Sequence, residues 1–175
     1  IASTKFSTKP ISITEDINQI TVTTGPLKTT ISKTNFNLFE GVWLDRNQDN
    51  IYSQTEQIIT PQTDNIQITD STTGQTFSGK GISDKILWEY RGPMRSTLRV
   101  DGRYRNGSGE FIAYTTRITF YAGRADVKIE HIIRNSYQPN ERNAKIKSAT
   151  VKMGSGITPV RITRSGSIFW ANMNS

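Results

Sequence analysis

The chain has 175 residues, with 22 Lys and Arg against 15 Asp and Glu, which gives a formal net charge of +7 at pH 7. It has no cysteine and one histidine, which excludes disulfide frameworks, thiolate nucleophiles, Cys-based metal sites and multi-histidine metal sites. Its apolar runs are too short to span a membrane.

The composition predicts β-structure. Ile occurs 22 times and Thr 23 times, whereas Leu occurs only 5 times. Residues branched at Cβ suit pleated sheets better than helices. Hydrophobic residues are only 34% of the chain, but Ile alternates with polar residues along its length, which a disordered tract would not do. We therefore predict an all-β fold, a single antiparallel barrel or sandwich.

The predicted elements follow one another as short strands and turns. Residues 1–16 are a leading strand or a linker, residues 17–150 form the β-domain, and residues 151–175 add strands to that domain or form a linking tail. We expect strands at residues 17–24, 29–39, 57–61, 65–70, 86–90, 94–105, 111–121, 127–135 and 144–153, and one or two more within 157–170.

The clearest alternation lies in residues 94–105. Even-numbered positions from Met94 to Tyr104 share one face, and odd-numbered positions from Arg95 to Arg105 share the other. The turn sequence Asn-Gly-Ser-Gly at 106–109 predicts a hairpin with the strand at 111–121.

The charge is divided unevenly along the chain. Residues 1–90 carry a net charge of −3, and residues 91–175 carry +10. The first part can therefore hold a cation site, while the second attracts anions.

Residues 45–56 fit the calcium-loop pattern D-x-[DN]-x-[DN]-G-x5-E at every position except the glycine, where Asn50 stands. The oxygen ligands of Ca²⁺ would come from Asp45, Asn47, Asp49, the Ile51 carbonyl, Ser53 and Glu56. Asn tolerates the left-handed conformation that the sharp turn requires. The alternative is a solvated loop rich in Asp and Asn that binds no ion.

The second candidate site is a basic sheet face with aromatic neighbours. Its residues are Arg95, Arg99, Arg103, Arg105 and Arg117, with Trp88 and Tyr90 beside them. Guanidinium groups two residues apart on a strand are separated by roughly 7 Å, which could match the carboxylates of an acidic polysaccharide. Nucleic acid would fit this spacing too, but we do not expect it as the partner. The alternative is a solvated face paired with carboxylates such as Asp101 and Glu110.

His131 shares a strand face with Val127, Ile129 and Ile133. We interpret it as a buried, hydrogen-bonded core residue, and a general base is the weaker alternative. The sequence contains no carboxylate pair, nucleophile elbow or phosphate-binding glycine loop, so it gives little reason to expect catalysis.

The lack of cysteine and the abundance of Thr and Asn favour an extracellular or cell-surface protein, although cysteine-free cytosolic domains are common. Because the chain begins at Ile1, we interpret it as a processed piece whose signal peptide has been removed. A glycosylation sequon occurs at Asn106-Gly107-Ser108, in an expected turn.

Four stretches resemble a known family. They are Thr24 to Leu27, Gly92 to Gly102, Arg117 to Gly123 (RITFYAG) and Val127 to His131 (VKIEH). Over about residues 17–148 the chain resembles the amino-terminal β-barrel region of exo-rhamnogalacturonan lyase and YetA-like proteins. The resemblance implies a RIFT barrel or a related sandwich. In that family this module precedes a central β-domain and an α/α toroid. The resemblance therefore implies that lyase chemistry lies largely outside the module, and 175 residues cannot hold the toroid.

These features give three functional hypotheses. The first is a non-catalytic extracellular module that binds or presents carbohydrate, with a calcium-stabilised loop. The second is a structural subunit of a surface layer or filament, which self-associates by strand addition through residues 1–16 and 157–170. The third is a polysaccharide lyase fragment that uses His131 or an arginine.

Overall fold

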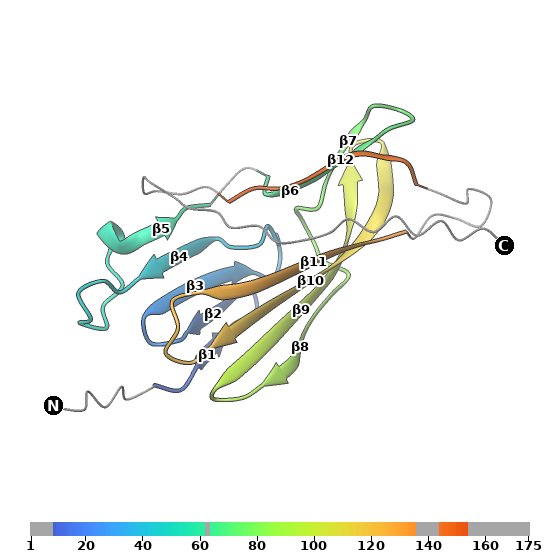
Figure 1. Cartoon of the computed structure of the whole chain (residues 1–175). Helices are drawn as coiled ribbons and strands as arrows, with labels where there is room; N and C mark the ends of the chain where they lie inside the picture. The colour runs from blue at the N-terminus through green and yellow to red at the C-terminus, as the bar shows by residue number, and fades with distance from the viewer. Residues whose placement is uncertain (1–8, 62–63, 136–143, 154–175) are drawn as a thin grey trace, which may run out of the picture.

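A computed structural model describes residues 9–61, 64–135 and 144–153 of the chain. The strands form two antiparallel sheets that make a β-sandwich (Figure 1). Of the two architectures expected from the sequence, the structure is the sandwich. The described ranges contain no α-helix, and nothing helical in them is long and apolar enough to cross a membrane. The strands expected within residues 157–170 lie outside the described residues.

The first sheet has five strands in the order β1-β2-β3-β4-β5. Their bounds are β1 Ser12–Glu15, β2 Gln19–Thr23, β3 Leu27–Ser32, β4 Gly41–Leu44 and β5 Gln57–Ile59, and a 3-10 helix, η1 Gln54–Glu56, precedes β5. The leading segment is therefore a strand from Ser12 to Glu15, at the edge of this sheet.

The second sheet has seven strands in the order β11-β10-β9-β7-β6-β12, with β8 paired to β9 beside this path. Their bounds are β6 Ile66–Asp70, β7 Thr76–Ser78, β8 Lys85–Arg91, β9 Arg95–Asn106, β10 Gly109–Tyr121, β11 Val127–Arg134 and β12 Ile146–Val151. The predicted long hairpin is confirmed as β9 and β10, with an irregularity between Glu110 and Ala113.

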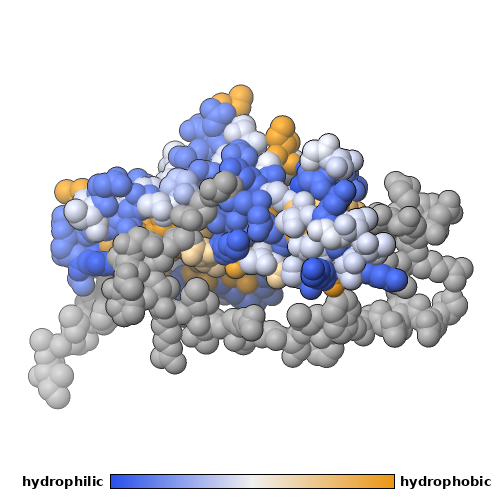
Figure 2. Space-filling view, turned by 90° about the horizontal axis from the view of Figure 1, so that it is seen from above, coloured by the Kyte–Doolittle hydropathy of each residue, from blue (hydrophilic) through white to orange (hydrophobic). Residues whose placement is uncertain are grey.

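Both sheets bury one hydrophobic core between them. Because side chains alternate across a strand, β2 contributes Ile20 and Val22, and β9 contributes Leu98 and Val100, all at most 1% exposed. In the view of Figure 2 hydrophobic residues form only small separate patches on a mostly polar surface.

Tyr114 is buried in this core and explains the glycine at position 102. Its hydroxyl donates a hydrogen bond to the Gly79 carbonyl at 2.7 Å. A Cβ added to Gly102, its cross-strand partner, would lie 2.5 Å from Tyr114 Cζ. The missing side chain at Gly102 therefore makes room for the ring.

The strand expected over residues 29–39 is shorter than predicted, because β3 ends at Ser32. There the Ser32 hydroxyl accepts a hydrogen bond from the Asn35 N–H at 2.9 Å and turns the chain. Leu38 then adopts a left-handed conformation, with φ 66°, while its side chain is buried. Such a conformation is unusual for an apolar residue and is held here by tertiary packing.

Candidate functional site

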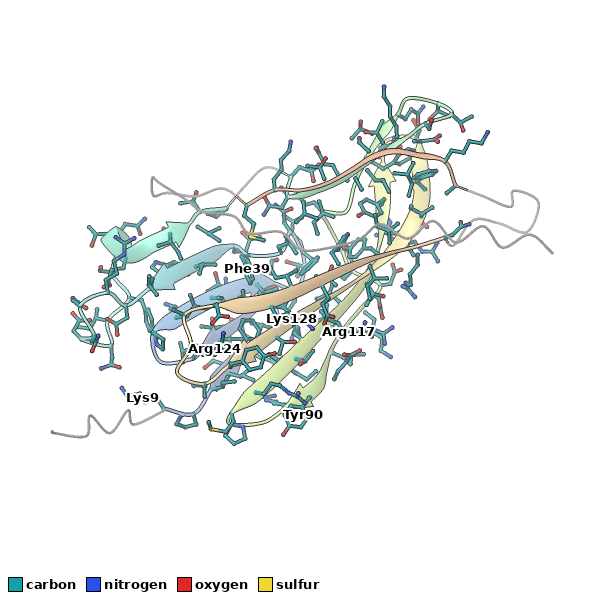
Figure 3. All side chains as sticks on the ribbon, viewed as in Figure 1. Lys9, Phe39, Tyr90, Arg117, Arg124 and Lys128 are labelled. Atoms are coloured by element: carbon teal, nitrogen blue, oxygen red, sulfur yellow. The ribbon has the colours of Figure 1, made fainter. Side chains whose placement is uncertain are left out.

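The five candidate arginines project from the outer surface of the seven-stranded sheet, which we call the arginine face. The inward positions of β9, such as Leu98 and Val100, are fully buried, so its odd-numbered residues point outward. Arg99 on β9 lies directly opposite Arg117 on β10. Arg117 and Tyr90 both belong to this sheet, as Figure 3 shows.

The carboxylate of Glu89 bridges the guanidinium groups of Arg99 and Arg117. The Arg117 Nε–H donates to both Glu89 carboxylate oxygens, at 3.0 and 2.8 Å, and Arg99 Nη1 lies 3.5 Å from the same carboxylate. The hydrogen bond from Arg117 is the main reason that the pKa of Glu89 lies below its ordinary value. Glu89 therefore holds two cations together that would otherwise repel each other.

Asp101 is a second, more buried anion of the same network. It is 8% exposed, its carboxylate lies 3.0 Å from Arg99 Nη2, and it accepts a hydrogen bond from the Thr115 hydroxyl at 2.6 Å. Burial by itself favours the protonated acid, but the Thr115 and Arg99 hydrogen bonds outweigh it and lower the pKa of Asp101. Arg134 lies 3.6 Å from this carboxylate as well.

Farther along β9, Arg103 and Arg105 share the carboxylates of Asp84 and Glu110. Arg105 donates to Glu110 at 2.8 Å and to Asp84 at 2.9 Å, and Arg103 lies 3.4 Å from both acids. In these two networks five guanidinium groups share four carboxylates. The arginine face therefore carries charges of both signs, with more cations than anions.

Arg95 differs from the other four arginines, since it has no carboxylate partner among the described residues. Its guanidinium lies over the ring of Tyr90, 4.9 Å from the centroid, and Tyr90 is 51% exposed. Trp88 is held differently, because its indole N–H donates to Glu15 at 2.7 Å and Arg91 lies over its ring. Tyr90 is thus accessible to a ligand, whereas Trp88 helps to connect the two sheets.

His131 faces the interior on β11. One ring nitrogen hydrogen-bonds the Tyr104 hydroxyl at 2.7 Å and the other the Thr116 hydroxyl at 2.8 Å. Burial lowers its pKa to about 4. None of the described carboxylates hydrogen-bonds its ring, so the structure supplies no acidic group to orient it as a general base.

The loop at 45–56 joins β4 to β5 and includes η1. Glu56 accepts hydrogen bonds from the Ser53 N–H at 3.0 Å, the Ser53 hydroxyl at 2.9 Å and the Arg46 N–H at 3.0 Å, and the two bonds from Ser53 are the main reason that its pKa is lowered. Asp45 is 7% exposed and accepts a hydrogen bond from the Asn50 N–H. In the part of the chain that the structure describes, no three acidic or histidine side chains are grouped closely enough to hold a metal ion as they stand.

Two features of these surfaces were missed from the sequence. No local pattern indicates that Glu89 and Asp84 lie among the arginines, because strand register decides that. On the outside of the five-stranded sheet, Lys28 Nζ lies 4.9 Å from the Trp43 ring centroid and 5.7 Å from that of Tyr52. A Lys and a Trp on neighbouring strands could have suggested this cluster, but their pairing was not predicted.

The sequon asparagine lies at the end of β9, beside the turn. The Asn106 side-chain oxygen accepts a hydrogen bond from the Ser108 N–H at 2.8 Å, and its amide nitrogen lies 3.3 Å from acceptors on Gln75 and Thr76.

Comparison with known proteins agrees with the fold. The model of the family described as "PcRGLX-like protein central beta sandwich domain" matches residues 11–157. A comparison with curated proteins gave no match. The resemblance to rhamnogalacturonan lyase-like proteins is thus confirmed, and the matched region is the central sandwich, where the sequence resemblance had pointed to the amino-terminal barrel. The chain belongs to the PcRGLX-like family, as its central β-sandwich domain.

Proposed function

We propose that this domain is a non-catalytic extracellular module that binds or presents an acidic polysaccharide through the arginine face. The observation that carries the proposal is the concentration of guanidinium groups on one continuous sheet surface, where two ion-pair networks hold five guanidinium groups and four carboxylates. Glu130 faces Arg117 on the same surface and is paired with Lys128. Arg95 adds a further cation to this surface that has no carboxylate partner among the described residues.

Exposed ion pairs of this kind exchange readily. Such pairs contribute roughly 0.2–1 kcal/mol each, so the carboxylates of a ligand can compete with Asp84 or Glu110 for Arg103 and Arg105. Guanidinium also binds carboxylate in a planar, two-pronged geometry. Tyr90, exposed and next to Arg95, offers an aromatic surface for a sugar ring.

The test uses Arg95→Ala, which leaves both ion-pair networks in place. Affinity electrophoresis in gels that contain polygalacturonate or rhamnogalacturonan should show retention of the wild type, a clear loss of retention in the variant, and weaker retention at high salt. Lys28→Ala is the matched control, because Lys28 is also a cation over an aromatic ring but lies on the outside of the five-stranded sheet. Equal loss in both variants, or no retention of the wild type, would contradict the proposal.

Absence of catalysis is tested with the same polymers. We expect no release of unsaturated uronate, measured by ultraviolet absorbance. Release that disappears in His131→Gln would support the lyase-fragment hypothesis instead.

A second candidate function is assembly by strand addition. The first and last described strands, β1 and β12, each lie at the edge of their sheet, where backbone groups are available to another chain. Concentration-dependent fibres that vanish when residues 1–16 are removed would favour this function over glycan binding.

A further inference from the structure

The loop at 45–56 contains a buried charge that the proposed function does not use. Asp45 is 7% exposed, and its Oδ2 accepts a hydrogen bond from the Asn50 N–H at 3.0 Å. Its Oδ1 is buried without a hydrogen-bond partner. A buried carboxylate oxygen without a partner is costly, and a bound cation would remove that cost.

Hydrogen bonds from backbone N–H groups to side chains of the same loop fix its backbone conformation. The Asn47 side-chain oxygen accepts a hydrogen bond from the Asp49 N–H at 3.2 Å, and Asp49 Oδ1 accepts one from the Ile51 N–H at 2.7 Å. Together with the bond from the Asn50 N–H to Asp45, these contacts curl the segment around its first residue.

The departure from the calcium-loop pattern is accommodated. Asn50 occupies the position where the pattern has glycine, and its φ is 66°, in the left-handed region that the glycine would supply. Asn50 in place of glycine therefore makes the left-handed turn less favourable in free energy but keeps its conformation.

The twelfth position closes the loop. Glu56 reaches Arg46, the second loop residue, with one carboxylate oxygen and Ser53, the ninth, with the other. Its carboxylate thus spans the two ends of the loop. To serve as a ligand, it would have to exchange some of these hydrogen bonds for an ion.

We propose that residues 45–56 bind one Ca²⁺ ion through Asp45, Asn47, Asp49, the Ile51 carbonyl and Glu56, with Ser53 contributing directly or through water. Oxygen donors of mixed type favour Ca²⁺, which accepts six to eight of them in irregular geometry, over Mg²⁺, which requires a near-ideal octahedron. The ion would tie β4 to β5 at the edge of the five-stranded sheet. Lys9 also reaches this loop, through a hydrogen bond to the Asn50 side chain.

Thermal unfolding with CaCl₂, with MgCl₂ or with EDTA tests the site. Loops in extracellular modules have dissociation constants of about 10⁻⁴ to 10⁻³ M, so 10 mM Ca²⁺ should raise the Tm by roughly 3–10 °C. Mg²⁺ should raise it much less.

The main variant is Glu56→Gln, which keeps a side-chain oxygen for the hydrogen bonds to Ser53 but removes the charge. It should fold and lose most of the Ca²⁺-dependent shift. The matched control is Glu130→Gln, which makes the same change in an exposed acid on β11 of the other sheet and should keep the full shift. Asn50→Gly should keep or enlarge the shift, because glycine adopts the same φ at lower cost.

Binding of Tb³⁺ provides a second readout, since Tyr52 lies within the loop and can sensitise the luminescence of the bound ion. Luminescence that Ca²⁺ displaces, and that Glu56→Gln lacks, would support the site. A wild-type Tm that neither Ca²⁺ nor EDTA changes, or an equal shift in Glu56→Gln, would overturn it. None of these measurements uses a glycan, so their failure is separable from failure of the proposed function.

Discussion

Protonation of the single histidine should destabilise this domain at mildly acidic pH. His131 is held neutral between the Tyr104 and Thr116 hydroxyls, and burial lowers its pKa to about 4 from the ordinary value of 6.5. Between those two values the unfolded chain binds a proton that the folded chain rejects. The stability from this group is therefore complete above pH 6.5 and is lost as the pH falls toward 4.

The size of the effect follows from that difference. The displacement from 6.5 to about 4 corresponds to about 3 kcal/mol at neutral pH, of which about 2 kcal/mol is lost between pH 7 and pH 5. Most carboxylates remain charged over this range, because their ordinary pKa values lie near 4. Urea unfolding at pH 7 and pH 5 therefore isolates the histidine.

The comparison that decides the matter is His131→Gln, which keeps polar atoms near both hydroxyls and cannot titrate. The variant should lose about 2 kcal/mol less than the wild type between pH 7 and pH 5. Because the chain has one histidine, its native pKa can also be read directly from the ring proton resonances. A native pKa near 6.5, or equal losses in both proteins, would show that burial does not keep His131 neutral.

Three further predictions concern packing and charge. Gly102→Ala should destabilise the domain by roughly 2–4 kcal/mol in urea unfolding, because its Cβ would displace Tyr114 from Gly79; a loss under 0.5 kcal/mol would show that the ring moves freely. Glu89→Gln should cost about 1 kcal/mol at low salt and less at high salt, since it leaves Arg99 opposite Arg117 without an anion; salt-independent stability would contradict this account. Ser53→Ala should cost about 1 kcal/mol through loss of its bond to Glu56, and an unchanged denaturation midpoint would argue against that bond.

Features that depend on residues close together in the chain were predicted correctly from the sequence. Alternation in residues 94–105 predicted both the strand and its buried face, and the Asn-Gly turn predicted the hairpin. The loop at 45–56 owes its shape to contacts between residues two to ten positions apart, which is why its pattern was visible. The strand predicted over residues 29–39 was too long because residues 33–39 depend on distant parts of the chain. The left-handed conformation of Leu38 is held by a core to which distant strands contribute.

The all-β class, the faces of the long hairpin and the positions of its arginines could be predicted from local patterns, because side-chain alternation is a property of each strand alone. The partners of those arginines could not, because they come from other segments of the chain. Glu89 and Asp84 reach them from β8 and the segment before it, in a register that no local pattern contains. The same holds for His131, whose partners Tyr104 and Thr116 come from two other strands. Charge and burial at these sites depend on pairing between strands, and that pairing is fixed when the whole core packs.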